Sequence, residues 1–292
     1  MTLREVVLSK GPLLADGATG TMLQKMGLPP GHPPEKWNLD NPDPVRHLAC
    51  TYGQAGSDLV FTNTFGANRI RLARFGLARQ VGELNRQAVR LAQEGATASG
   101  KTLFIVGSVG PTGELLEPYG DLEPKEAQDA FAEQCEALAS SGVDGIVGET
   151  FTDLQEAVAF VRAAREVTSL PIFVSLSFEK TGRTVLGVDP IVALQQLTDE
   201  GALVVGANCG DGIEPVSLVI RQMRNRFPDA LLLAKPNAGI PIVRGTELFY
   251  PATPDDLAQF ASEMKSLAVT IIGGCCGTTP DHIAAMSQIL KP

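Results

Sequence analysis

Eight short apolar runs recur along the chain, and each is followed by a polar or glycine-containing turn and then by a segment with helical spacing. The runs are continuous rather than alternating, which is typical of strands buried on both faces of a parallel sheet. They lie at residues 12–20, 58–66, 103–111, 144–150, 171–178, 203–210, 231–239 and 269–277. Eight strands alternating with helices in 292 residues predict a (β/α)8 TIM barrel, with one domain over residues 1–292. A doubly wound open sheet is the alternative, although such sheets usually contain fewer strands.

Three helical segments carry recognisable start signals. A helix is predicted to begin at Pro124, because proline suits the first turn of a helix. In the segment 152–167, Thr152 is the expected N-cap, and Gln155 stands three residues on, where a capping box places it. The segment 253–267 repeats that design.

The longest irregular stretch is expected at residues 25–44, which hold six prolines and the only tryptophan, Trp37. A long loop inside a compact domain is usually functional or disordered. This stretch follows the first strand, on the end of the barrel where such folds keep their active sites. We therefore expect it to border the site.

Composition excludes several classes of protein. The net charge of −9 and the pI near 4.9 argue against a nucleic-acid partner, which requires a basic face. The sequence contains no run of 18 uninterrupted apolar residues, so no membrane span is expected. Its N-terminal segment lacks the apolar region of a signal peptide. The cysteine count is five, which is odd and sparse for a disulfide scaffold. A reduced, cytoplasmic setting is expected.

Polar residues stand where the predicted strands end. In a barrel the carboxyl ends of all strands converge on one mouth, so these side chains should meet there. The residues are Asp16, Gly17, Asn63, Ser108, Glu149, Asn208, Cys209, Asn237, Cys275 and Cys276.

Three of these residues, Cys209, Cys275 and Cys276, suggest a metal site at the mouth. Thiolates select zinc among the common divalent ions, and a catalytic zinc keeps three protein ligands and an open fourth position. A long separation along the chain is no obstacle, because the barrel rather than a local loop would bring the cysteines together. The pattern predicts an open zinc site.

Glycines surround the adjacent pair Cys275 and Cys276. Neighbouring residues of a regular strand point to opposite faces, so both thiols can reach one ion only if the strand breaks. Gly273, Gly274 and Gly277 would supply that freedom, since glycine adopts backbone angles closed to other residues. Three other readings stay open: a redox disulfide, two unrelated core residues, and a structural site with four cysteines.

The carboxylates Asp16 and Glu149 suit a small zwitterionic ligand, because a buried carboxylate is usually paired with a cation. Neither has an Arg or Lys nearby in sequence, so a substrate ammonium is the predicted partner. Lys235 is expected to point outward. Backbone N–H groups of residues 16–20 could bind a carboxylate. Alternatively, Asp16 only caps the following helix.

The remaining cysteines and histidines have simpler readings. Cys50 and Cys135 fall in helical segments, where small buried hydrophobic residues are expected. His282 follows Pro280 in a first helical turn and is predicted to be a solvated surface residue.

Seven motifs together resemble the homocysteine S-methyltransferase family. They are DGATGTMLQ, TNTFGAN, GPTGE, DGIVGETFTD, VGANCGDG, KPNAG and GGCCGTTPDHI, and they extend from residue 16 to residue 283. The resemblance implies that zinc is bound by Cys209, Cys275 and Cys276, and that homocysteine is contacted by Asp16, Gly17 and Glu149. Asn63 and Ser108 are further substrate contacts that we predict from their places at strand ends.

Within this family the chain is most similar to the homocysteine-binding module of cobalamin-dependent methionine synthase. That similarity implies that Asn237 is a fourth zinc ligand when substrate is absent. The branch that uses betaine has a tyrosine where this chain has Gly66, which weakens a betaine reading. The folate- and cobalamin-binding modules of the full synthase are not recognised in this sequence. We therefore expect either one module of such an enzyme or a free-standing enzyme that takes its methyl group from a partner or a small donor.

The implied reaction is transfer of a methyl group to the homocysteine thiol, forming methionine, with methylcobalamin or methyltetrahydrofolate as the implied source. Zinc lowers the pKa of a thiol, so a separate protein base is not required. S-methylmethionine and betaine are alternative donors. A zinc hydrolase and a zinc- or thiol-sensing barrel remain open as different classes, although three thiolates make zinc a poor Lewis acid for activating water.

Overall fold

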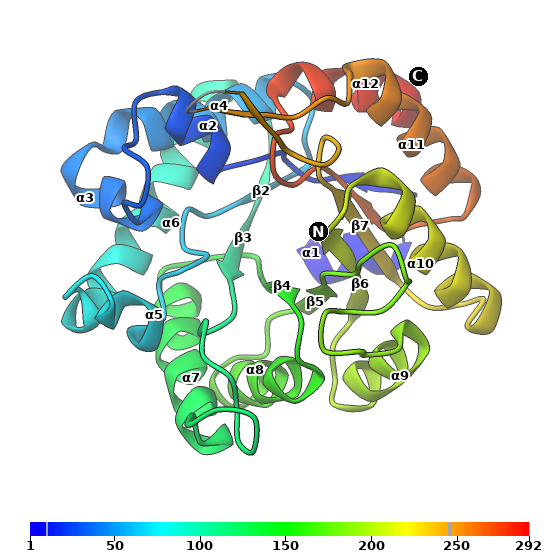
Figure 1. Cartoon of the computed structure of the whole chain (residues 1–292). Helices are drawn as coiled ribbons and strands as arrows, with labels where there is room; N and C mark the ends of the chain where they lie inside the picture. Colours follow the sequence, from blue (N-terminus) through cyan, green and yellow to red (C-terminus); the bar gives the residue numbers. More distant parts are fainter. Residues whose placement is uncertain (10, 245–246, 292) are drawn as a thin grey trace.

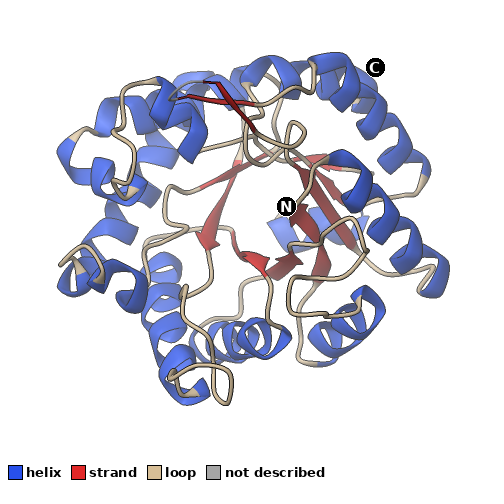
Figure 2. Ribbon diagram, in the orientation of Figure 1, coloured by secondary structure: helices blue, strands red, loops and turns tan. Residues whose placement is uncertain are grey.

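The computed structural model describes residues 1–9, 11–244 and 247–291 of the chain. A ring of parallel strands lies at the centre, and helices surround it (Figures 1 and 2). The barrel strands are β1 (Leu13–Leu14), β2 (Leu59–Phe61), β3 (Phe104–Val109), β4 (Gly145–Phe151), β5 (Ile172–Leu176), β6 (Val204–Cys209), β7 (Leu232–Pro236) and β10 (Ile271–Ile272). The (β/α)8 barrel predicted from the eight apolar runs is confirmed, because each run matches one of these strands, with β4 extending one residue beyond its run.

Helices connect the strands and cover the outside of the barrel. They are α1 (Leu3–Ser9), α2 (Gly20–Lys25), η1 (Pro34–Lys36), α3 (Trp37–Asp40), α4 (Pro42–Gln54), α5 (Arg69–Ala73), η2 (Ala78–Gln80), α6 (Val81–Ser99), α7 (Pro124–Ser140), α8 (Leu154–Val167), α9 (Pro190–Asp199), α10 (Ile213–Arg226), α11 (Pro254–Ser266) and α12 (Pro280–Leu290). None of the helices in the described part of the chain is long and apolar enough to cross a membrane.

Hydrogen bonding closes the sheet into a barrel. The strand order is β1-β10-β7-β6-β5-β4-β3-β2, with parallel pairing throughout. The two ends of this order meet, since Ala15 forms a parallel bridge with Leu59 and the N–H of Asp58 donates to the carbonyl of Leu14 at 2.6 Å. Closure leaves the barrel without a free edge. The direct pairing of β10 with β7 and of β7 with β6 brings these three strands side by side.

The interior of the barrel is filled by a small apolar cluster from alternate strand positions, such as Phe61, Val147 and Leu233. Leu3, Val6 and Val7 of α1 belong to the same cluster. A Cβ atom at Gly145, the first residue of β4, would lie 3.0 Å from the Leu3 side chain. Helix α1 therefore closes the N-terminal end of the barrel, and the carboxyl ends of the strands form the opposite, functional mouth.

The predicted helix signals are partly confirmed. Helix α7 begins at Pro124, and α11 has Thr253 as N-cap in a capping box with Asp256. The N-cap of α8 is Asp153, not Thr152, because the Asp153 side chain accepts the N–H of Gln155 at 2.7 Å. A carboxylate one residue later makes the capping bond, so the predicted cap was wrong by one position.

Two segments differ from expectation. Residues 25–44 are not one irregular loop, because η1, α3 and the start of α4 fall within them, with proline in the first turn of η1 and α4. The prolines therefore begin helices here, as their fixed φ allows. An antiparallel hairpin, β8 (Ile242–Arg244) and β9 (Glu247–Phe249), was not predicted. It lies in the β7–α11 connection, beside the mouth.

Candidate metal centre

The three predicted cysteines lie together at the mouth. Cys209 ends β6, and Cys275 and Cys276 follow β10. Their sulfur atoms all lie within 4.8 Å of one another. A tetrahedral zinc site with bonds of about 2.3 Å separates its sulfurs by roughly 3.8 Å, so the cluster needs little movement to hold an ion.

Main-chain hydrogen bonds fix the turn that carries the adjacent thiols. The N–H of Gly274 donates to the Asp16 carbonyl at 3.0 Å, and that of Cys275 donates to the Pro236 carbonyl at 2.8 Å. The Cys276 carbonyl accepts the N–H of Ala238 at 2.9 Å. Regular strand pairing ends at Ile272, so the strand does break where two neighbouring thiols must share a site.

The glycines of this turn act in two different ways. Only Gly277 has a left-handed backbone, with φ +79°, and a Cβ atom there would lie 2.1 Å from the Tyr250 ring. Gly273 and Gly274 do not have positive φ. They are needed for close packing, because a Cβ at Gly274 would lie 2.4 Å from Thr278. The expectation of backbone freedom therefore holds for Gly277 alone.

Asn237 is the fourth group beside the thiols. Its Nδ2 donates to the Gly210 carbonyl at 2.8 Å, which fixes the orientation of the amide. Its Oδ1 is buried and has no hydrogen-bond partner among the described residues. Because a buried, unpaired polar atom is costly, this oxygen calls for a partner that the described residues do not supply. Three thiols with one available oxygen fit a zinc ion.

The protein environment alone keeps the thiols protonated. Hydrogen bonding to Cys209, together with burial, raises the pKa of Cys275 well above its usual range. A hydrogen bond with Cys275 lowers the pKa of Cys209, but the bond with Cys276 and burial outweigh it and raise this pKa to about 12. A bound cation would favour the thiolates, so metal binding at this cluster should release protons.

Lys235 points into the barrel, so the expectation that it points outward was wrong. Its Nζ lies 2.8 Å from Asp16 Oδ1 and 3.5 Å from the centre of the Phe61 ring. Burial by itself would lower the pKa of Lys235, but the charges of Asp16 and Glu149 outweigh burial and raise it. Both carboxylates therefore favour the charged form of Lys235, and Asp16 is in direct contact with it.

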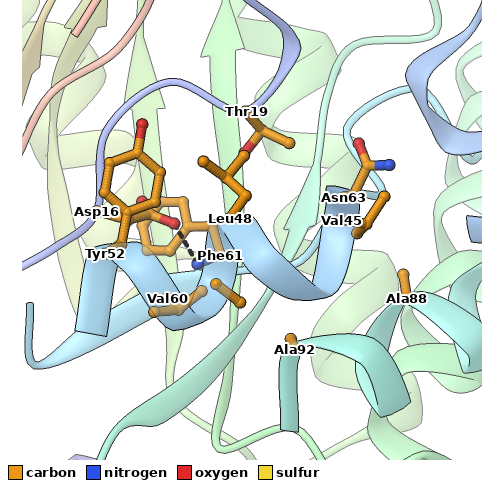
Figure 3. A pocket seen from close by; sticks show the side chains of 11 residues that line it. Asp16, Thr19, Val45, Leu48, Tyr52, Val60, Phe61, Asn63, Ala88 and Ala92 are labelled. Carbon is orange, nitrogen blue, oxygen red and sulfur yellow. Dashed lines mark hydrogen bonds between the residues drawn. The ribbon is translucent and has the colours of Figure 1, made fainter. Parts of the chain in front are cut away.

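Asp16 consequently has a partner from its own chain, Lys235, and not only the predicted substrate ammonium. Its Oδ2 accepts the N–H of Phe61 at 2.7 Å, the bond drawn in Figure 3. Burial raises the pKa of Asp16, while the Lys235 charge and these hydrogen bonds act in the opposite direction. Asp16 does not cap α2, whose N-cap is Thr19.

Glu149 lies at the end of β4, next to a break in the pairing of β4 with β5. One carboxylate oxygen accepts the Ser108 hydroxyl at 2.5 Å. Burial raises the pKa of Glu149, and the Lys235 charge and the Ser108 hydrogen bond lower it. Ser108 thus orients the Glu149 carboxyl group, which lies near the end of β4 that faces the mouth.

Gly17 and Asn63, which are also predicted to contact the substrate, have packing roles in the structure. A Cβ at Gly17 would lie 2.7 Å from Thr278 and from the Tyr52 hydroxyl. Asn63 Nδ2 donates to Asn38 Oδ1 and to the Pro34 carbonyl, both at 2.8 Å, and so anchors η1 and α3. Figure 3 shows Asn63 across a pocket from Asp16. The residues lining that pocket do not include the cysteines.

The histidine prediction was wrong, and the cysteine prediction holds in part. His282 is buried, and its ring contacts Thr279 and, at 3.0 Å, the Ala252 carbonyl. It takes the third position of a capping box, where its ring nitrogen replaces a carboxylate. Cys135 is fully buried and Cys50 half-buried. Neither is in a disulfide.

The motifs and strand ends predict no role in the site for Lys235 or Asn208. The position of Lys235, however, follows from the periodicity of its strand. Residues two apart on a strand share a face. Leu233 faces the barrel interior, so Lys235 should face it too. Asn208 is fully buried and contacts Cys275, as described below.

Comparison with known proteins identifies the family. The family model for homocysteine S-methyltransferase matches residues 13–290. Methionine synthases of Mycobacterium leprae and Mycobacterium tuberculosis are 33% and 32% identical over 94% and 98% of this chain. The chain spans 24% and 25% of the lengths of these relatives, about a quarter.

Solved structures agree in fold. The homocysteine methyltransferase MmuM from Escherichia coli, in its metallated form, superposes with a TM-score of 0.82 at 23% identity, over 98% of this chain and 99% of that one. Its oxidised form gives a TM-score of 0.83 at 24% identity, over 98% of both chains. Since the family match extends over nearly the whole barrel, the chain belongs to the homocysteine S-methyltransferase family.

Proposed function

We propose that this protein transfers a methyl group to the thiol of homocysteine, forming methionine, at a zinc ion held by Cys209, Cys275 and Cys276. The observation that carries the proposal is the cluster of three thiols beside the unpartnered Oδ1 of Asn237. Asn237 would complete the zinc site when substrate is absent. Zinc bound there would lower the pKa of the substrate thiol, so that it reacts as a thiolate.

The chain's own residues would bind and orient the amino acid. Glu149 is the proposed partner of the substrate ammonium, because only one of its oxygens is engaged by Ser108. Asp16 and Gly17 are proposed contacts that rank second, since Asp16 already accepts from Lys235 and Phe61. Holding the ammonium at Glu149 would aim the substrate sulfur at the donor. Ser108 would contribute by orienting the Glu149 carboxylate, and Asn63 by holding η1 and α3 in place.

The methyl group is proposed to come from methylcobalamin on another domain or a partner protein. The methionine synthase relatives are about four times as long as this chain, which leaves room for such domains in them. A cytoplasmic location is part of the same proposal.

The donor can be tested directly. The zinc-loaded protein would be given homocysteine with methylcobalamin, S-methylmethionine or betaine in parallel, and methionine would be measured. Methionine formation from methylcobalamin alone supports the proposal. Turnover with S-methylmethionine or betaine alone would favour a free-standing enzyme with a small donor. Hydrolytic activity, or zinc binding without any methyl transfer, would favour the other classes.

Replacement of Glu149 by glutamine should weaken homocysteine binding by 1.5–3 kcal/mol, which is about 10- to 150-fold. The change removes the charge but keeps the shape, so zinc content should stay the same. Calorimetry with the zinc-loaded protein measures the affinity. The matched ligand is 4-mercaptobutanoate, which lacks only the amino group and should bind both proteins alike.

The same residue gives a pH dependence. An ordinary glutamate has a pKa of about 4.3. Because burial raises the pKa of Glu149, this residue should become protonated at a higher pH than an ordinary glutamate does. Homocysteine affinity should therefore fall as pH decreases through this raised pKa, and the Glu149→Gln variant should lack that step. Identical pH profiles for the two proteins would contradict the assignment.

Replacement of Asn237 by alanine should reduce zinc affinity by about tenfold while leaving one zinc per chain, because the three thiols remain. Chelator competition measures the affinity. X-ray absorption on the substrate-free wild-type protein should show three sulfurs and one lighter ligand. Four sulfurs in that state would rule out Asn237 as a ligand.

A further inference from the structure

Asn208 is a fully buried residue at the end of β6, and all the hydrogen-bonding capacity of its amide is used. Its Oδ1 accepts the N–H of Thr150 and the hydroxyl of Ser175, both at 2.8 Å. Its Nδ2 donates to Thr150 Oγ1 at 2.7 Å and to Cys275 Sγ at 3.7 Å. One side chain thus reaches β4, β5 and the turn after β10.

The contacts allow one orientation of the amide only. If the amide were reversed, Nδ2 would face the Thr150 N–H, and two donors would oppose each other. The donor side must therefore face the Cys275 sulfur. An aspartate has the same shape but lacks the donor, and it would place a negative oxygen against the sulfur. Asparagine therefore satisfies all of these contacts at position 208, whereas aspartate does not.

The acceptor side of Asn208 supports a strained part of β4. Thr150 has φ 65°, a left-handed conformation that is unusual for a β-branched residue. Such strain persists only where surrounding contacts hold it. The pairing of β4 with β5 also shifts between Gly148 and Phe151. This irregularity contains Glu149, and irregularities of this kind redirect side chains near active sites.

We propose that Asn208 is a positioning residue that joins the metal centre to the substrate-binding carboxylate, by donating to Cys275 and by holding the Thr150 N–H next to Glu149. This inference rests on the proposed function and adds a residue to it. Groups that hydrogen-bond to metal ligands orient them and tune the site. The same amide would set the distance between the reacting sulfur and the ammonium contact.

Two substitutions separate the two roles. Asn208→Asp keeps an oxygen for Thr150 and Ser175 but removes the donor to Cys275. It should weaken zinc binding by about 10- to 100-fold, as for other partners of metal ligands. It should change the ratio of homocysteine affinity to 4-mercaptobutanoate affinity by no more than about threefold. Asn208→Ala removes both roles, so zinc affinity and this ratio should both fall about tenfold or more.

The control is Ser175→Ala, which removes one hydrogen bond to the same amide but touches neither Cys275 nor Thr150. Zinc affinity and the ratio of homocysteine affinity to 4-mercaptobutanoate affinity should both stay within about threefold of wild type in this variant. Zinc affinity is measured by chelator competition, and thiol affinities are measured by calorimetry on zinc-saturated protein. Circular dichroism of the metal-free variants checks folding, and Asn208→Asp keeps the test valid if Asn208→Ala does not fold.

The outcomes are distinct. Wild-type zinc affinity in Asn208→Asp would show that donation to Cys275 does not matter. A wild-type affinity ratio in Asn208→Ala would show that Asn208 does not position Glu149. Either result overturns the joined role. If the wild-type protein itself does not distinguish homocysteine from 4-mercaptobutanoate, the proposed ammonium contact at Glu149 fails, and this is seen without any variant. Failure of the proposed function is seen separately, as the absence of methionine formation by the wild-type protein.

Discussion

Replacing Cys276 by alanine should lower zinc affinity more than about 100-fold, beyond the effect of removing a group that only orients a ligand. Methyl transfer should fall to background. The barrel should stay folded, with the free energy of unfolding of the metal-free protein changed by less than about 1 kcal/mol, because Cys276 is only half-buried at the mouth. Zinc content by mass spectrometry and urea unfolding measure the two effects.

Cys50→Ala is the matched control, because Cys50 is also half-buried but lies on α4, outside the thiol cluster. It should retain full zinc and activity. If Cys276→Ala retained one tightly bound zinc, the assignment of the cluster as the metal centre would be wrong.

Replacing Lys235 by methionine should cost about 3–5 kcal/mol of stability at pH 7, the usual loss when one partner of a buried ion pair is removed. The side chains of Lys235 and Asp16 are only 3% and 2% exposed, so water cannot replace the lost charge. Glu149 would lose the same counter-charge. Urea unfolding of the metal-free protein measures the loss.

The sign of the pH dependence identifies the cause. Without Lys235, protonation of Asp16 and Glu149 removes the uncompensated charge, and burial already raises both pKa values. The stability loss should therefore shrink as pH falls below 7. The double variant Asp16→Asn, Lys235→Met should recover part of it. Lys125→Met, which removes an exposed pair with Asp129, should cost no more than about 0.5 kcal/mol. A loss below 1 kcal/mol in Lys235→Met would show that Lys235 is not the counter-charge.

The barrel could be predicted because each strand is a continuous apolar run bounded by turns, a pattern set by burial on both faces. The cysteine cluster could be predicted because strand ends converge in this fold, whatever their separation in sequence. Convergence of the strand ends therefore predicts that Cys209 and Cys275 meet, and their sulfur atoms do lie together in the structure. Local pattern and global topology agreed at these positions.

The errors occurred where a partner comes from a distant segment. The sequence predicts a substrate ammonium as the partner of Asp16, because its actual partner, Lys235, lies far along the chain, on β7. His282 was placed on the surface because the Ala252 carbonyl that covers it precedes α11. Asn208 has contacts on three other elements, which no local pattern reports. Side-chain pairing across the barrel depends on register and on strand irregularities, which sequence periodicity alone does not fix.

The order of strands around the barrel has a consequence for unfolding. Cys209, Asn237 and the Cys275–Cys276 turn lie on or directly after β6, β7 and β10, which are neighbours in the sheet. An ion bound by all of these residues would cross-link the chain between residues 209 and 276. A cross-link that closes so long a loop lowers the conformational entropy of the unfolded chain. The last third of the barrel would then open as one cooperative unit, and only when the metal leaves.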